Sequence, residues 1–227
     1  MTGAAFTTLA HTATRRRVVA LAIGATGLVA SAWTPSPADA RDLDMPGPDA
    51  PIAALNQGLM AIMRAGKTTP FIERFQQLAP LIDQTFDLPA ILRACVGLRW
   101  SGLSAADQAA LLKAFRTFTI ASYVANFDEY NGERFVIGTN IRAVGEDEIV
   151  PTSIVPGNGG APTEIDYVMH IGHDGWRAVD VLLDGTISRV AVQRSDFRSL
   201  LGDGGATPLI DSLRRKAATL SDGAIPS

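Results

Sequence analysis

The sequence has few of the residues on which enzymes, metal sites and nucleic-acid-binding surfaces usually depend. Its 227 residues include one cysteine, Cys95, and three histidines. A single cysteine cannot form an intramolecular disulfide, so the packed core must supply the stability. Acidic residues outnumber basic ones by 23 to 20, which leaves no surplus of positive charge for binding nucleic acid. No apolar run after residue 40 is long enough to cross a bilayer.

Recognisable catalytic motifs are also absent from the sequence. It contains no G-x-S-x-G, no H-E-x-x-H and no glycine-rich phosphate loop. His170 and His173 stand three residues apart on an expected strand, where side chains alternate between faces. A metal site would need a third ligand, for which Asp174 and Asp180 are the candidates. We therefore expect no metal site, and we expect Cys95 to be a small buried apolar residue rather than a reactive thiolate.

The first forty residues have the pattern of a bacterial export signal. Residues 15–17 are arginines, residues 18–32 are apolar or small, and residues 38–40 are Ala-Asp-Ala, a typical cleavage site. The arginine cluster suits either the general secretory route (Sec) or the twin-arginine route. We expect cleavage after residue 40 and a periplasmic location. Residues 1–40 hold three arginines and one aspartate, so the remainder has 17 basic and 22 acidic residues and a net charge of −5.

Beyond this signal, the spacing of the apolar residues changes from that of helices to that of strands. Residues 41–50 are rich in proline and aspartate and are expected to form a flexible lead. Helical spacing extends over 51–131, the alternation typical of strands over 132–193, and helical spacing again over 194–217. The tail, 218–227, is expected to fray. This order predicts an α+β fold with an antiparallel sheet of four to five strands.

Polar residues at characteristic positions predict where the helices begin. We expect Thr69, Asp87 and Ser195 to be N-caps, and Ser104 to open the longest helix through a capping box. The expected strands are 135–144, 148–155, 163–172 and 176–183, with 186–192 as a fifth strand or as the lead into a helix.

Aromatic side chains are concentrated on the longest expected helix and its end. Five of them lie within sixteen residues: Phe115, Phe118, Tyr123, Phe127 and Tyr130. They can form an ordinary core, or the core and a pocket for an apolar ligand can be the same region.

Asp180 is unusual because it lies in the middle of an expected strand, between two valines. We expect it to pair with a basic side chain such as Arg142 or Arg177. An alternative is an enzyme, an isomerase or a hydrolase, in which an inward-facing Asp180 without a basic partner acts as a base in an apolar pocket. A further alternative is a non-catalytic module that bridges envelope proteins, for which a filled core is expected.

Several short motifs follow one another in a recognisable order. They are Phe86-Asp87-Leu88, Val96-Gly97-Leu98-Arg99-Trp100-Ser101-Gly102-Leu103-Ser104, Tyr130-Asn131-Gly132, Gly175-Trp176-Arg177-Ala178-Val179-Asp180-Val181 and Leu209-Ile210-Asp211-Ser212-Leu213. Together they resemble the MlaC family of periplasmic phospholipid-binding transport proteins, also called the toluene-tolerance family. The turn Gly185-Thr186-Ile187-Ser188 has one residue more than is usual in that family, and in this it resembles the hopanoid-associated HpnM branch.

The resemblance implies a lipid-binding domain over 51–217, in which helices and a curved sheet, similar to the cone of ketosteroid-isomerase-like folds, enclose an apolar cavity. It implies a carrier, without cofactor or catalysis, that moves a phospholipid or hopanoid between membrane complexes and supports outer-membrane lipid asymmetry. The implied partners are an inner-membrane MCE-type ABC transporter and an outer-membrane complex, and we expect a monomer. The residues predicted to line the lipid tails are Phe118, Phe127, Tyr167, Met169, Val179, Val181, Leu183 and Ile187.

Overall fold

The computed structural model describes residues 45–201 and 205–227, so the expected export signal, 1–40, lies outside the described residues. Helices come first, antiparallel strands follow, and two helices close the chain, which confirms the expected α+β class. The elements are α1 (Ala50–Ala65), α2 (Phe71–Thr85), α3 (Leu88–Val96), the 3-10 helix η1 (Gly97–Gly102), α4 (Ala105–Asn126), β1 (Arg134–Ile137), β2 (Arg142–Val144), β3 (Asp147–Val155), β4 (Thr163–Gly172), β5 (Gly175–Leu183), β6 (Ile187–Ser188), α5 (Arg189–Arg198) and α6 (Thr207–Leu220). None of the helices in the described ranges is both long and apolar enough to cross a membrane.

The sheet has six strands in the order β1-β3-β4-β5-β6, with β2 also paired to β3. The single strand expected over 135–144 is therefore wrong, because the structure divides it into β1 and β2 along the same edge of β3. Pro151 of β3 lies at the break and has no N–H to donate, although its carbonyl oxygen accepts a hydrogen bond from the Gly138 N–H at 2.7 Å. The ladder is interrupted at that point and resumes at β2.

Two of the four expected N-caps are confirmed. The Asp87 carboxylate accepts a hydrogen bond from the Ala90 N–H at 2.9 Å, and the Ser104 hydroxyl accepts one from the Asp107 N–H at 3.1 Å. Thr69 is not a cap, because its hydroxyl donates backwards to the Ala65 carbonyl.

Ser195 is also not a cap, because α5 begins seven residues earlier than expected. Ser188 is the N-cap of α5, and its hydroxyl accepts a hydrogen bond from the Ala191 N–H at 2.9 Å. The segment expected as a possible fifth strand is thus a two-residue strand, β6, that leads directly into the helix.

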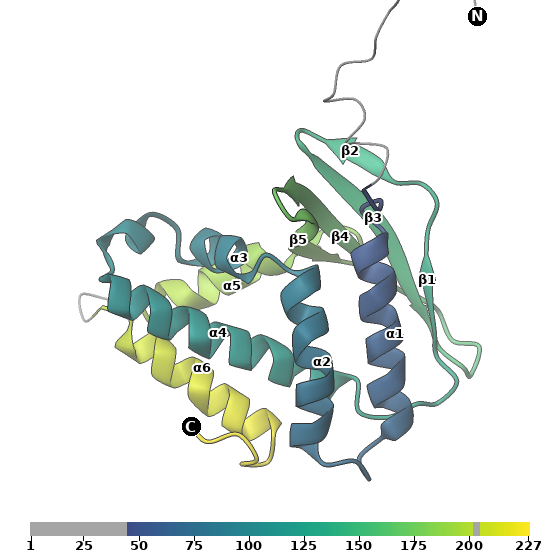
Figure 1. Cartoon of the computed structure of the whole chain (residues 1–227), viewed down its shortest axis with the longest axis horizontal. Helices are drawn as coiled ribbons and strands as arrows, with labels where there is room; N and C mark the ends of the chain where they lie inside the picture. Colours follow the sequence, from purple (N-terminus) through teal and green to yellow (C-terminus); the bar gives the residue numbers. More distant parts are fainter. Residues whose placement is uncertain (1–44, 202–204) are drawn as a thin grey trace, which may run out of the picture. The chain divides into compact units, whose positions relative to one another are not determined.

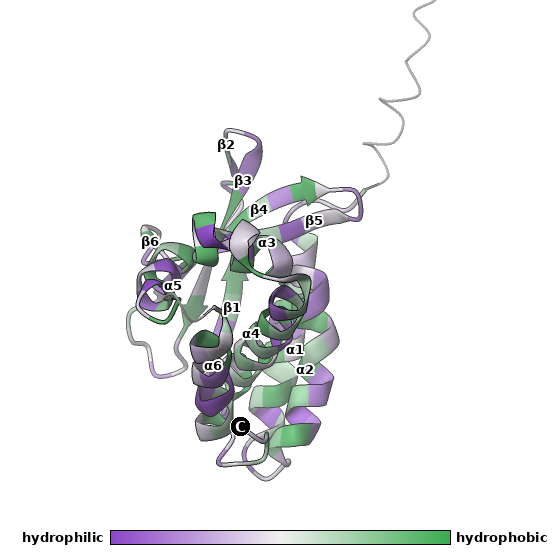
Figure 2. Cartoon of the chain, turned by 90° about the vertical axis from the view of Figure 1, so that its left-hand side faces the viewer, coloured by the Kyte–Doolittle hydropathy of each residue, from purple (hydrophilic) through white to green (hydrophobic). Residues whose placement is uncertain are grey.

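The helices lie on one side of the sheet (Figure 1), where α1 packs against α2 and α4 packs along α6. Figure 2 shows that α1 and α2 each carry both apolar and polar segments, as expected for helices that bury one face. Their buried residues join one core with α4 and the inner face of the sheet. Leu55, Leu78, Phe115, Val150 and Met169 are almost completely buried there.

The end of the chain is folded, so the expectation that residues 218–227 fray is wrong. Helix α6 continues to Leu220, and Ser221 and Ile225 are both buried. The Ser221 hydroxyl accepts a hydrogen bond from the Ile225 N–H at 2.9 Å, which turns the tail back. Ile225 then packs with Ala121 of α4 and Ala217 of α6.

The loop between β3 and β4 lies directly against the segment that follows α4. A Cβ atom added to Gly157 would lie 2.2 Å from the Asn131 carbonyl oxygen and 2.7 Å from the Gly132 Cα. Both contacts are with backbone atoms, which cannot move away as a flexible side chain can. Glycine at position 157 therefore permits this close approach.

Gly157→Ala is expected to lower the free energy of unfolding by about 1–3 kcal/mol, because the loop must move away from its neighbour. Denaturation in urea, followed by circular dichroism, measures the change. Gly102→Ala is the matched control, since no atom lies within 4 Å of the added methyl group. Equal stability of the two variants would contradict the proposed close contact.

Candidate functional site

A cavity of about 650 Å³ lies between α4, the inner face of β4 and β5, and α5. Its wall is largely apolar, with Phe86, Leu88 and Ile91 at one side and Ile165 and Val190 among the residues that close it. A volume of this size is within the range of small-molecule pockets in proteins, roughly 300–1,000 Å³. The cavity makes this region more than an ordinary filled core.

Five of the eight side chains predicted to line a lipid do line this cavity. They are Phe118, Phe127, Tyr167, Val181 and Leu183. The structure brings them together because Tyr167 pairs with Val181 across β4 and β5, while the two phenylalanines reach the same space from α4 and its C-terminal end.

Three predicted residues lie elsewhere. Met169 faces the helices but is completely buried in the packed core beyond the cavity. Ile187 belongs to β6 at the sheet edge and is 49% exposed. Val179 lines a different, smaller cavity of about 110 Å³, together with His170 and Arg177.

The misplacement of Val179 is caused by a β-bulge. Val168 pairs with Asp180 and Met169 pairs with Ala178, so Val179 has no partner on β4. The extra residue shifts the alternation of side chains, and Ala178 rather than Val179 becomes completely buried. The prediction assumed strict alternation along the strand, and alternation cannot reveal a bulge.

Asp180 lines the large cavity, and its carboxylate accepts three hydrogen bonds. The donors are the Val181 N–H at 2.7 Å, the Val190 N–H at 3.0 Å and the Ser188 hydroxyl. The Val190 N–H belongs to the first turn of α5, where a negative charge is favourable. Asp180 therefore joins β5 to β6 and to the start of α5.

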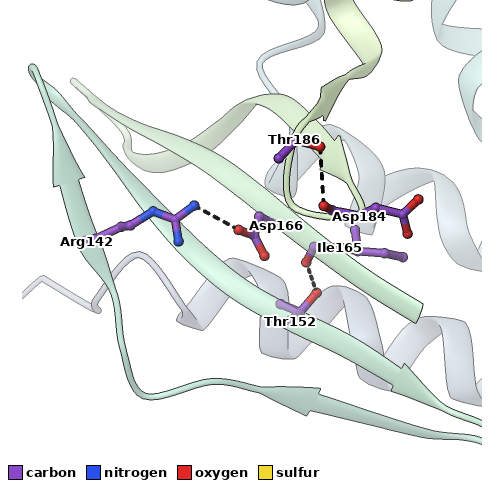
Figure 3. A network of polar contacts seen from close by, with 6 residues as sticks. All are labelled: Arg142, Thr152, Ile165, Asp166, Asp184 and Thr186. Atoms are coloured by element: carbon purple, nitrogen blue, oxygen red, sulfur yellow. Dashed lines mark hydrogen bonds and ion pairs between the residues drawn. The ribbon is translucent and has the colours of Figure 1, made fainter. Parts of the chain in front are cut away.

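The expected pairing of Asp180 with Arg142 or Arg177 is wrong. Arg142 reaches from β2 to Asp166 on β4 at 3.0 Å, as Figure 3 shows, and Arg177 is 3.9 Å from Asp174. Backbone and hydroxyl donors take the place of the expected cation. With its oxygens occupied in this way, Asp180 has a structural role that also accounts for its unusual position.

The two histidines do not converge. The His170 Nδ1 is 2.7 Å from the Asp147 carboxylate, whereas His173 is fully exposed in the β4–β5 turn, 2.9 Å from the Asp174 carboxylate. That carboxylate raises the pKa of His173. Within residues 45–201 and 205–227, no group of three or more histidine, cysteine, aspartate or glutamate side chains could hold a metal ion.

Cys95 is buried, as expected, with 1% of its surface exposed. Its sulfur lies 3.4 Å from the Gln193 side-chain oxygen. Burial, and to a smaller extent the negative charge of Asp180, raises the pKa of the thiol from 9.0 to about 12.

Several residues of the cavity wall were not predicted from the sequence. The most informative is Tyr123, which faces Tyr167 across the wall and lies on the cavity side of α4 with Thr119 and Asn126. These positions are three and four residues apart, so the helical spacing from Phe118 and Phe127 could have identified them. Arg189 and Gln193 were not predicted, because both precede the helix expected after Ser195, whereas the structure places them within α5.

Burial affects both tyrosines. It raises the pKa of the Tyr167 phenol to about 12, while the neighbouring Tyr123 hydroxyl acts in the opposite direction. The pKa of Tyr123 is raised well above its ordinary value by burial and by the nearby Tyr167, and the positive charge of Arg189 opposes this rise. Tyr123, Tyr167 and Arg189 all line the same cavity.

Comparison with known proteins places these features in a wider group. Residues 53–215 match the family model described as MlaC protein. Among solved structures, the chain is similar to one described as the phospholipid-binding protein from Ralstonia solanacearum in complex with a phospholipid. That similarity has a TM-score of 0.67 and 18% sequence identity, and it covers 78% of this chain and 99% of the other. A search of curated proteins finds no match.

Asp180→Ala is expected to lower the free energy of unfolding by about 2 kcal/mol, because it leaves donors in β5, Ser188 and the first turn of α5 without their acceptor. Urea denaturation checks this value. Asp196 is the control, because it is an aspartate within α5 whose side chain is exposed. Asp196→Ala should change the free energy of unfolding by less than about 0.5 kcal/mol. If the two variants are equally stable, the anchoring role of Asp180 is wrong.

Cys95 is expected to resist alkylation by iodoacetamide in the native protein at about pH 8, because the reactive thiolate is disfavoured by burial. The raised pKa means that the folded state holds the proton more tightly, so stability contributed by the neutral thiol is lost as the pH rises from 9.0 toward about 12. Mass spectrometry should detect rapid labelling only after unfolding in urea. Rapid labelling of the native protein would show that the thiol is accessible.

Proposed function

Because the chain belongs to the MlaC family, we propose that it is a carrier that encloses the apolar tails of a phospholipid in the cavity between α4, the sheet and α5. The cavity of about 650 Å³ is the observation that carries this proposal. The MlaC family consists of periplasmic, non-catalytic lipid-binding carriers. The Ralstonia solanacearum protein of similar fold, which was solved with a phospholipid, gives further support for this cargo.

Burial energies explain why such a lipid needs a carrier. Each methylene group transferred from an apolar environment into water costs about 0.8 kcal/mol, so two long acyl chains are held in a bilayer by roughly 20 kcal/mol. Side chains such as Phe118, Phe127 and Val181 replace the membrane interior, so the chains remain out of water. No covalent bond has to form or break. Release then requires a partner that alters the cavity, because tight apolar binding alone would retain the lipid.

The proposal includes the remaining expectations about location and partners. Residues 1–40 act as the export signal, and the domain over 51–217 shuttles lipid across the periplasm as a monomer. Its partners are an inner-membrane MCE-type ABC transporter and an outer-membrane complex. The five predicted residues on the cavity wall contact the lipid tails, whereas Met169, Val179 and Ile187 do not.

A hopanoid is the alternative cargo. The observation that favours it is the turn Gly185-Thr186-Ile187-Ser188, which has one residue more than is usual in the family and in this resembles the HpnM branch. Lipid mass spectrometry of the protein, exported to a hopanoid-producing bacterial periplasm and purified without detergent, separates the two cargoes. Stoichiometric phospholipid supports the proposal, and stoichiometric hopanoid supports the alternative.

An empty protein that also takes up no lipid from vesicles would contradict the carrier function itself.

The enzyme alternative loses its basis because the family is non-catalytic and because Asp180 is engaged by three donors. A simple bridging module does not account for the cavity.

Val181→Glu and Leu183→Glu are expected to abolish lipid retention while the chain still folds, because each introduces a carboxylate into the apolar wall. Ile187→Glu is the matched control from the adjoining β6, and it should retain lipid because Ile187 is exposed outside the cavity. Lipid bound per protein is measured by mass spectrometry, and folding by circular dichroism. Retained lipid in both wall variants would show that the tails bind elsewhere.

A further inference from the structure

The cavity wall contains one polar feature that its apolar character does not explain. Tyr123 of α4 and Tyr167 of β4 both line the cavity and both pack against the ring of Phe86. The distances from the Phe86 ring centre to the two tyrosine ring centres are 5.7 Å and 6.2 Å. Tyr167 is only 4% exposed. Phenylalanine at either position would make the wall more apolar, so the hydroxyls call for an explanation of their own.

The number of hydroxyl protons shows what the pair lacks. Two phenol groups have two protons, and only one can be donated within the pair. Among the hydrogen bonds of the described residues, neither phenol donates to a backbone carbonyl or a carboxylate. No hydrogen bond of either phenol to another protein group is found among the described residues, and no completely enclosed side-chain oxygen there lacks a partner, so neither phenol oxygen is completely enclosed. Both side chains line the cavity, and at least one O–H therefore reaches its open space. It is a donor without a protein acceptor.

The other hydroxyls on α4 differ in this respect. Thr119 donates to the Phe115 carbonyl oxygen at 2.9 Å, and Ser122 donates to the Phe118 carbonyl oxygen at 2.8 Å. Both line the cavity, but both direct their protons into their own helix. The tyrosine pair therefore offers a proton to the contents of the cavity that these two hydroxyls do not.

A positive charge lies close to the same pair. Arg189 is the one basic side chain on the described cavity wall, and in the described residues it forms no ion pair within 4 Å. The backbone donors at the start of α5 are already engaged, because the Val190 N–H binds Asp180 and the Ala191 N–H binds Ser188. An anion at this end of the cavity would thus meet the Arg189 guanidinium rather than the helix amides.

We propose that the Tyr123–Tyr167 hydroxyl pair donates a hydrogen bond to an ester carbonyl of a glycerophospholipid, with the phosphate of the same lipid beside Arg189. This inference rests on the proposed lipid-carrier function and names the chemical class that the cavity selects. A diacyl glycerophospholipid carries the acceptor and the anion a short distance apart, next to its acyl tails. A triterpene hydrocarbon has neither, so it would leave the hydroxyl and the guanidinium dehydrated without a partner.

A competition between two lipids tests the inference directly. The protein is incubated with vesicles that contain equal amounts of diester phosphatidylglycerol and its diether analogue, which has the same phosphate but no carbonyl groups. The bound lipids are then quantified by mass spectrometry. The wild-type protein is expected to bind the ester form about 3- to 10-fold more than the ether form, the usual effect of one hydrogen bond.

Variants then assign the preference to the hydroxyls. Tyr123→Phe with Tyr167→Phe should bring the ratio of ester to ether lipid among the bound lipids close to one. Thr119→Val is the matched control, since it also removes a wall hydroxyl, and it should keep the wild-type ratio. Arg189→Gln should reduce the preference for phosphatidylglycerol over diacylglycerol without changing the ester-to-ether ratio.

The outcomes separate this inference from the proposed function. Equal uptake of ester and ether lipids by the wild-type protein would overturn the inference and leave the carrier function intact. This result does not depend on whether any variant folds. The same ratio in the double phenylalanine variant and the wild type would also overturn it. Preferential uptake of a triterpene hydrocarbon added to the same vesicles would contradict it too. A protein that takes up no lipid at all would overturn both.

Discussion

The cavity depends on the way in which the carboxylate of Asp180 joins β5 to the start of α5. A carboxylate beside an apolar space is costly unless donors surround it, and here backbone and hydroxyl groups do so. The bulge at Val179 lies immediately before Asp180 on the same strand. Val190 and Gln193 of α5 are thereby held at the wall of the cavity instead of filling it.

This arrangement separates the requirements of folding from those of binding. The dense core between α1, α2, α4 and the sheet supplies the stability, with Leu55, Leu78 and Met169 almost without exposed surface. The aromatic groups at its border are held by one another: the Tyr123 and Phe127 rings are stacked at 6.0 Å, and Phe127 lies 5.8 Å from Phe135. A wall supported in this way can remain in place around a space that is not filled by protein.

The sequence predicted features that depend on neighbouring residues better than features that depend on packing. Asp87 and Ser104 were identified as caps because a cap is defined within four residues, and the α+β class followed from the change of spacing near residue 132. The position of Val179 was not predictable, because a bulge depends on the pairing of two strands. Five wall residues were identified because aromatic and β-branched residues suit both a core and a cavity wall. The same ambiguity placed Met169 in the site, since only the three-dimensional packing decides where the core stops.

The folded tail has a practical consequence for handling the protein. Ile225 covers the junction of Ala121 and Ala217, so the last turn belongs to the helical layer although it lies at the end of the chain. An affinity tag or reporter joined before this residue would remove a contact that holds α4 against α6. A fusion should therefore begin after Ser227, with a spacer long enough to leave the turn undisturbed.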